Sequence, residues 1–198
     1  MVEGKFSVVF CGYNWEGENI LNSFINDSRF SVGAVVIPKN YDDSFVGGVK
    51  KISHERGIKL VEGINNVNEM SFDLGIMTAY PFLFSNSILS VPSSGWVGNH
   101  HSLLPKYRGF HPIQWALENC EKEIGTSIFI LEEGADSGDI LFQSSVHVRL
   151  DETYDSIRKR LHKIVATEFA NCCADYLEGT LTPIPQNHSK ATIFERYY

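Results

Sequence analysis

The stretch "KFSVVFCGY" (Lys5–Tyr13) decides the fold, because it is a short, continuous apolar run that ends at Gly12. Such a run is typical of a β-strand that is buried on both faces of a parallel sheet. The next segment, "NWEGENILNSFIND", carries apolar residues at helical spacing. "FSVGAVVIP" (Phe30–Pro38) is a second apolar run, stopped by a proline. A strand, a helix and a strand are therefore predicted in succession.

The same alternation continues along the first half of the chain. We expect a helix over "DSFVGGVKKISHERG" (Asp43–Gly57), weakened by its two adjacent glycines, and strands at "IKLVEG" and "FDLGIMTAY" (Phe72–Tyr80). This rhythm predicts an α/β fold with a doubly wound, Rossmann-like and mainly parallel sheet. In such sheets, ligands bind beyond the carboxyl ends of the strands.

The second half of the chain is predicted to add two helices, further strands and a tail. "HPIQWALENC" indicates a short helix with Pro112 at its first position, and "GTSIFILEEG" (Gly125–Gly134) indicates a strand. The turn "GADSGD" leads into "ILFQSSVHV". A long helix is expected from about Asp151, a candidate N-cap, to Glu178, with Gly179 just past its end. The tail reads as extended and interrupted by prolines.

Composition narrows the class of protein. The 198 residues are 43% hydrophobic and 21% charged, which predicts one globular domain over residues 1–198. The net charge of -7 argues against non-specific binding to nucleic acid or to an anionic membrane. The sequence has neither a signal-peptide pattern nor an apolar run approaching the ~20 residues that cross a bilayer, so we expect a cytoplasmic protein. Four cysteines without metal-type spacing predict buried, reduced thiols.

Two common nucleotide-binding motifs are absent from the sequence. The turn after the first predicted strand reads "CGYNWEG", which is not a G-x-G-x-x-G motif, and no G-x-x-x-x-G-K-[ST] motif occurs. A nicotinamide dinucleotide site or a P-loop nucleotide site would therefore lack its usual phosphate cradle.

Three turn-like segments are expected to gather at the carboxyl end of the sheet: "AYPFLFS", "GNHHSLLPKYRG" (Gly98–Gly109) and "EEGADSGD". Together they offer histidine, asparagine, serine, aspartate, arginine and flexible glycines. This set suits acyl-group chemistry on an amine, which needs a base near neutral pKa, a carboxylate to orient it and donors for an oxyanion. It does not suit a catalytic zinc site, which would need a second His or Cys at i+3 or i+4.

The order of "HHSLLPKYRG", "HPIQWAL" and "EIGTSIFILEEGADSGDIL" resembles the folate-dependent formyltransferase domain. The similarity runs from the first strand to roughly Arg196. It implies transfer of the formyl group of 10-formyltetrahydrofolate to a primary amine, without a covalent enzyme intermediate and without a metal. The family carries this out with a histidine, a distant aspartate that orients it, and an asparagine that stabilises the oxyanion.

The family pattern N-x-H-x-S-L-L-P is one residue longer than the pattern found here. Alignment on the Ser-Leu-Leu-Pro motif makes His100 the catalytic histidine and places Gly98 where the family has asparagine. Alignment on Asn99 makes His101 the catalytic histidine instead. The separation between His100 and Asp136 matches that of the family, so the resemblance favours His100 and Asp136. Asn99 is the candidate for the oxyanion donor, although it is displaced.

The resemblance also implies two sets of binding residues. Residues expected at the pterin are Tyr80, Phe82, Leu83, Glu133, Gly134 and Asp136. Residues expected near the acceptor are His101, Lys106, Arg108 and His111. Structural alternatives are apolar core for the aromatic loop, an ordinary turn former for Asp136, a helix cap for His111, and solvated surface charge for the two cations.

The acceptor is the most open part of the prediction. "KYRGFHPIQWAL" is nearer to formyltransferases that act on amino sugars, which favours a dTDP- or UDP-linked 4-amino sugar used for surface polysaccharide. Alternatives are glycinamide ribonucleotide formyltransferase, formyltetrahydrofolate deformylase and a catalytically silent folate-binding domain. The chain stops where methionyl-tRNA formyltransferases continue into a C-terminal tRNA-binding domain, so we expect no such domain and no tRNA substrate. The oligomeric state stays open, with a homodimer as one alternative.

Overall fold

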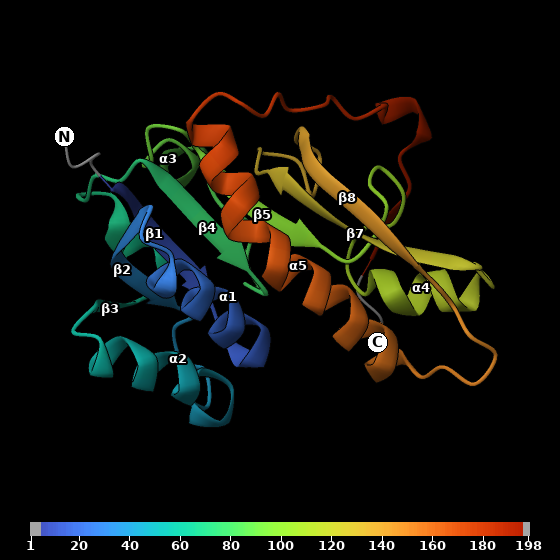
Figure 1. Ribbon diagram of the computed structural model, residues 1–198, viewed down its shortest axis with the longest axis horizontal. Helices are drawn as coiled ribbons and strands as arrows, with labels where there is room; N and C mark the ends of the chain where they lie inside the picture. Colours follow the sequence, from blue (N-terminus) through green and yellow to red (C-terminus); the bar gives the residue numbers. More distant parts are fainter. Residues whose placement is uncertain (1–4, 196–198) are drawn as a thin grey trace. The chain divides into compact units, whose positions relative to one another are not determined.

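The computed structural model describes residues 5–195, which form two compact units, residues 5–98 (unit 1) and residues 99–195 (unit 2). Figure 1 shows the course of the chain through both. Each unit is described by itself. The single domain predicted over residues 1–198 stays a prediction, and residues 1–4 and 196–198 of that range lie outside the described residues.

Unit 1 holds a parallel sheet in the order β3-β2-β1-β4-β5, with helices between the strands. The predicted α/β class with a mainly parallel sheet is confirmed. The elements are β1 (Phe6–Gly12), α1 (Asn14–Asn26), β2 (Phe30–Ile37), α2 (Asp43–Glu55), β3 (Lys59–Glu62), the 3-10 helix η1 (Ile64–Val67), β4 (Leu74–Thr78), α3 (Asn86–Leu89) and β5 (Trp96–His100), whose last two residues belong to unit 2.

Two glycines explain how closely the elements of unit 1 approach one another. Gly12 ends β1 at the point where it pairs with Thr78 of β4, and a Cβ there would lie 2.8 Å from the carbonyl oxygen of Thr78. Gly48 does not break α2, although its helix propensity is low. Its missing side chain leaves the room that Glu18 of α1 occupies, so α1 and α2 pack together.

Unit 2 is built on an antiparallel hairpin of β7 and β8. The elements are β6 (Arg108–Gly109), α4 (Pro112–Glu118), β7 (Glu123–Ile130), β8 (Ile140–His147), α5 (Tyr154–Leu177), the 3-10 helix η2 (His188–Lys190) and β9 (Ile193–Phe194). The predicted N-cap of the long helix, Asp151, is wrong. Thr153 caps α5 instead, because its hydroxyl accepts a hydrogen bond from the amide of Ser156 at 3.3 Å. Gly179 follows the helix at a φ of +71°, as expected.

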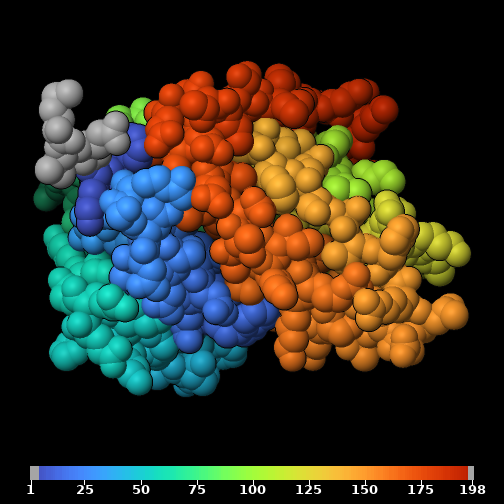
Figure 2. Space-filling view, viewed as in Figure 1, coloured from blue at the N-terminus to red at the C-terminus, as the bar shows by residue number. Residues whose placement is uncertain are grey.

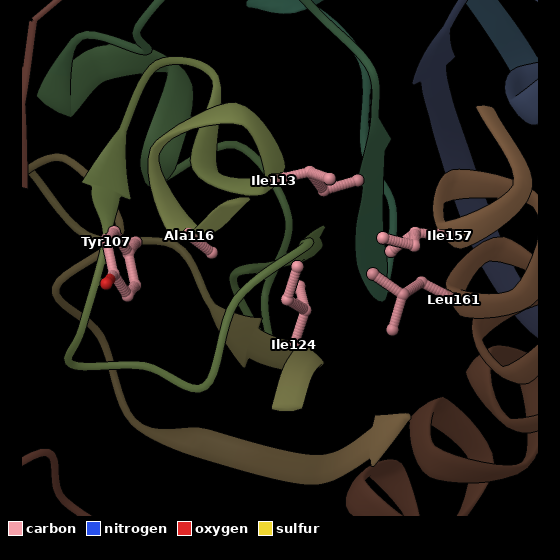
Figure 3. Close-up of a cluster of buried hydrophobic side chains, with 6 residues drawn as sticks. All are labelled: Tyr107, Ile113, Ala116, Ile124, Ile157 and Leu161. Carbon is pink, nitrogen blue, oxygen red and sulfur yellow. The ribbon is translucent and has the colours of Figure 1, made fainter. Parts of the chain in front are cut away.

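A cluster of buried apolar side chains joins α4, β7 and α5 inside unit 2 (Figure 3). It consists of Tyr107, Ile113, Ala116, Ile124, Ile157 and Leu161. The side chain of Tyr107 is thus anchored in the core, and its hydroxyl donates to Glu121 at 2.9 Å. The loop that follows β5 is consequently anchored to the core of unit 2 through the side chain of Tyr107.

The tail after α5 is extended, as predicted, and it folds back on unit 2. Ile184 forms a β-bridge with Ile140 of β8, and β9 pairs in parallel with β6. Residues 184–194 are called the C-terminal strap below. Figures 1 and 2 show the strap (red) at the surface of unit 2.

The four cysteines are free thiols, but they are not all buried as expected. Cys11, Cys172 and Cys173 are buried, whereas Cys120 is exposed just after α4. Burial raises the pKa of Cys172 to about 12 and the pKa values of Cys11 and Cys173 well above their usual range. Within residues 5–195, no helix combines the length and the apolar character needed to cross a membrane.

Candidate active site

The segment that was expected to be a turn, "GNHHSLLPKYRG", begins as a strand. Its first residues complete β5, so His100 is the last residue of that strand. The stretch Trp-Val-Gly-Asn-His has neither a continuous apolar run nor a strict alternation, so its pattern predicts no strand at β5. The consequence is that His100 ends a strand and lies in the interior, with 9% of its surface exposed.

The hydrogen bond of His100 determines which ring nitrogen is available for chemistry. Its Nε2 lies 2.7 Å from the backbone carbonyl oxygen of Tyr107. A carbonyl oxygen only accepts hydrogen bonds, so Nε2 carries the hydrogen and donates it. Nδ1 is therefore the nitrogen that gains or loses a proton. It faces Oδ2 of Asp136 at 3.6 Å, which is an ion-pair distance when the ring is protonated and too long for a direct hydrogen bond.

Asp136 lies in the connection between β7 and β8, in a left-handed backbone conformation with a φ of +48°. Aspartate tolerates this region better than most residues do. Its Oδ2 accepts a hydrogen bond from the amide of Gly109 at 2.8 Å. The side chains of His100 and Asp136 are 10% and 19% exposed, so their interaction is weakly screened by water. The structure thus places His100 and Asp136, which lie far apart in the sequence, next to each other.

His101 and Asn99 do not join this pair. Nδ1 of His101 lies 3.2 Å from the hydroxyl of Thr126, which itself donates to the backbone carbonyl of His100. Successive side chains of a strand point to opposite faces, so Asn99 lies on the other face of β5 from His100. Oδ1 of Asn99 is buried without a hydrogen-bond partner among the described residues.

The two cations expected near the acceptor have different surroundings. Lys106 is exposed and pairs with Glu121 at 3.5 Å, beside a cavity of about 140 Å³ that His101 also lines. Arg108 is 5% exposed, and its guanidinium donates to Oε1 of Gln186 from Nε at 3.2 Å and from Nη2 at 2.6 Å. Burial lowers the pKa of Arg108, and the nearby carboxylates of Asp136 and Glu132 oppose that shift. Arg108 is thus a buried side chain that is hydrogen-bonded to Gln186, and not a solvated surface charge.

His111 stands at the N-cap position of α4 with a φ of +56°, and its side chain makes no capping hydrogen bond. The helix-cap alternative for His111 therefore holds for its backbone position only. Glu133 and Gly134, expected at the pterin, are exposed in the β7–β8 connection, where Ser137 donates to the carbonyl of Gly134 at 3.1 Å.

The aromatic loop expected at the pterin belongs to unit 1. Tyr80 is buried and packs edge-on against Phe82, whereas Phe82 and Leu83 are 54% and 77% exposed. Burial raises the pKa of Tyr80 above its usual range. These three residues line a cavity of about 440 Å³ together with Lys39, Glu62 and the segment 63–66. The loop therefore presents apolar side chains at a cavity large enough for part of a ligand.

Gln186 was not predicted as a site residue. It is 5% exposed, and its amide donates to the carbonyl oxygens of Asp136 at 2.9 Å and Gly138 at 2.6 Å. No motif marks it, because it stands fifty positions away from the aspartate whose turn it holds. Among residues 5–195, no cluster of three or more His, Cys, Asp or Glu side chains is suited to holding a metal ion.

Comparison with known proteins identifies the family. Residues 30–170 match the formyl transferase family. This chain belongs to that family. The methionyl-tRNA formyltransferase of Kosmotoga olearia is 36% identical over 152 residues, which cover 73% of this chain and 49% of the relative. The methionyl-tRNA formyltransferase of a Synechocystis strain is 34% identical over 167 residues, 84% of this chain and 51% of the relative. The chain thus spans about half the length of these curated relatives.

Solved formyltransferases share the fold. The N-formyltransferase of Helicobacter canadensis, in complex with folinic acid and dTDP-3-aminofucose, has a TM-score of 0.81 at 18% identity, over 96% of this chain and 70% of the other. Glycinamide ribonucleotide transformylase 1 of Symbiobacterium toebii has a TM-score of 0.78 at 18% identity, over 91% and 94% of the two chains. The predicted membership of the formyltransferase family is confirmed.

Proposed function

We propose that this chain transfers a formyl group from 10-formyltetrahydrofolate to a primary amine, with His100 and Asp136 as its catalytic pair. The observation that carries the proposal is the fixed orientation of the imidazole. Nε2 of His100 is committed to the carbonyl of Tyr107, so Nδ1, facing Asp136, is left as the basic atom.

The reaction needs one proton to be removed and one to be returned. As the amine nitrogen bonds to the formyl carbon, Nδ1 of His100 accepts the proton that the nitrogen loses. The carboxylate of Asp136 stabilises the imidazolium that results. The tetrahedral intermediate then expels N10 of tetrahydrofolate, and His100 returns the proton to that nitrogen. The products are the formamide and tetrahydrofolate, and no bond to the enzyme forms.

For the acceptor, we propose a nucleotide-linked amino sugar, such as a dTDP- or UDP-4-amino sugar. The resemblance of "KYRGFHPIQWAL" to the enzymes that act on amino sugars supports it, and the net charge of -7 disfavours a polyanion such as tRNA. Methionyl-tRNA is the second candidate, because the 36% identical relative from Kosmotoga olearia is a methionyl-tRNA formyltransferase.

One assay separates the candidates. The purified chain is mixed with 10-formyltetrahydrofolate, and the release of tetrahydrofolate is followed with each acceptor: dTDP- and UDP-4-amino sugars, glycinamide ribonucleotide, methionyl-tRNA, and none. We expect release that depends on an amino sugar, with a formylated product detected by mass spectrometry. If methionyl-tRNA were the one acceptor that supports release, it would take the place of the amino sugar as the proposed acceptor. Release without any amine would indicate a deformylase. Folate binding without turnover with any amine would contradict formyl transfer.

A further inference from the structure

We propose that Gln186, oriented by Arg108, is a positioning residue that holds the Asp136 turn in the place that His100 requires. The inference rests on the proposed function, because it concerns the same pair of residues. It assigns a role to the C-terminal strap (residues 184–194), which contributes no group to the proton transfers described above.

The contact between Gln186 and the turn is specific. Both donated hydrogen bonds come from Nε2, and their acceptors are the backbone carbonyls of Asp136 and Gly138. They bracket the turn on either side of Ser137, at a point where Asp136 adopts a left-handed conformation. Such a conformation costs about 1 kcal/mol or more for a residue other than glycine, so it needs neighbours that hold it. Gln186 supplies two of those contacts from a buried position.

Arg108 determines which way the amide of Gln186 points. A guanidinium only donates hydrogen bonds, so the group that it contacts at 2.6 Å must be the oxygen of the amide, Oε1. The NH₂ group is then directed to the turn and cannot exchange places with the oxygen without breaking bonds on both sides. Nη2 of Arg108 also donates to Nδ1 of His188, which fixes a second residue of the strap.

The strap also holds the other partner of His100. The hydroxyl of Thr192 accepts a hydrogen bond from the amide of Tyr107 at 2.8 Å, and its carbonyl accepts one from the amide of Arg108 at 2.9 Å. The carbonyl of Tyr107 is the group that orients His100. The amide of Gly109, two residues after Tyr107, donates to the carboxylate of Asp136. One segment therefore braces both the acceptor of Nε2 and the turn that faces Nδ1.

The test compares two glutamine variants. Gln186→Met keeps the length and the unbranched shape of the side chain but removes its donors and its acceptor. Gln143→Met is the matched control, because the amide of Gln143 likewise donates to a backbone carbonyl, that of Leu104 at 2.8 Å, but does not contact the Asp136 turn. For each variant, kcat, KM for both substrates and the hydrogen exchange of the Gly109 amide are measured.

For Gln186→Met we expect kcat to fall by about 10- to 100-fold, because a misplacement of about 1 Å has that effect, while KM changes less than twofold. The Gly109 amide should exchange faster, since it loses a fixed carboxylate acceptor. Gln143→Met should match the wild type in all three. A raised KM with unchanged kcat, or Gly109 exchange equal to that of the wild type, would overturn the proposal.

The experiment still tests the proposal if the wild type is inactive or if Gln186→Met does not fold. If the wild type transfers no formyl group, the proposed function fails, whereas the Gly109 exchange still tests the positioning. If Gln186→Met does not fold, Arg108→Lys replaces it, since lysine keeps the charge but loses the fork that orients the amide. We then expect a smaller fall in kcat, of at least about threefold, with faster Gly109 exchange; wild-type values for both would overturn the proposal.

Discussion

His100 and His101 are neighbours in the chain, yet their rings have different partners. Nε2 of His100 donates to the carbonyl of Tyr107 at 2.7 Å, whereas Nδ1 of His101 lies 3.2 Å from the hydroxyl of Thr126. That hydroxyl donates its hydrogen to the carbonyl of His100, so it accepts from His101. Nδ1 of His100 thus faces the carboxylate of Asp136, whereas Nδ1 of His101 donates to a hydroxyl.

This difference predicts that the two histidines respond differently to truncation. His100→Ala removes the base, so we expect formyl transfer to fall by about 10²- to 10⁴-fold or below detection. His101→Ala should leave a readily measured rate, because it removes a ring that contacts a structural hydroxyl. Tetrahydrofolate release with the best acceptor is the measurement. The reverse result would show that the motif aligns on Asn99 and not on the Ser-Leu-Leu-Pro segment.

The carboxylate that faces His100 is predicted to act through its charge. Asp136→Asn keeps the shape of the side chain, and its amide oxygen still accepts from the amide of Gly109. It no longer stabilises an imidazolium, so we expect kcat to fall by about 100-fold or more. Asp139→Asn, in the same turn, is the control and should stay within about threefold of the wild type. Equal effects of both changes would mean that the turn, and not the charge at Asp136, is what matters.

The fold follows from local patterns in unit 1, where buried strands read as apolar runs. "FSVVFCG" and "FSVGAVVI" became β1 and β2 within one residue of their predicted ends. β5 was missed because its pairing with β4 comes from distant residues, Gly75 to Met77, and not from its own pattern. The N-cap of α5 shifted to Thr153 because both Asp151 and Thr153 are capping residues, and only the backbone geometry chooses between them.

The site, like the fold, could be predicted only where short stretches of sequence carry the signal. His100 and Asp136 lie in short motifs, and their residue types, a histidine and a carboxylate, indicate proton-transfer chemistry. Arg108 also looked like a solvated cation, because its sequence neighbours are turn-forming. Its burial depends on Gln186 and His188, which are 78 and 80 positions away. Contacts over such separations leave no periodic signal in a single sequence.

The pairing of β6 with β9 predicts a backbone requirement at Gly109. Its φ is +91°, and a Cβ at this position would collide with the carbonyl oxygen of Phe194. We expect Gly109→Ala to lower the free energy of unfolding by about 2 kcal/mol or more in urea titrations. Gly47→Ala is the control, since a Cβ there meets nothing within 4 Å in α2. It should raise stability by about 0.5–1 kcal/mol. A neutral Gly109→Ala would mean that β9 detaches at little cost.

The ion pair at the start of α5 predicts a pH-dependent contribution to stability. Both oxygens of Glu152 lie 2.7 Å from Nη1 of Arg160, and these hydrogen bonds hold the pKa of Glu152 below its usual value. A carboxyl with a lowered folded-state pKa stabilises the fold above its unfolded pKa of about 4.3, and that stability is lost as pH falls through the folded-state value. Glu152→Gln should therefore cost about 1 kcal/mol at pH 7 and nothing near pH 2. A pH-independent difference in urea midpoints would contradict this.

The exposure of the four thiols predicts their order of reaction with a thiol reagent. Cys120 is exposed, whereas Cys11, Cys172 and Cys173 are buried and have raised pKa values, which lower the fraction of reactive thiolate. At pH 8 we expect one equivalent of Ellman's reagent to react within minutes in the native protein, and four in urea. Cys120→Ser should abolish the fast equivalent without changing the total of the other three. Rapid labelling of that variant would show that the interior of the native protein opens to the reagent.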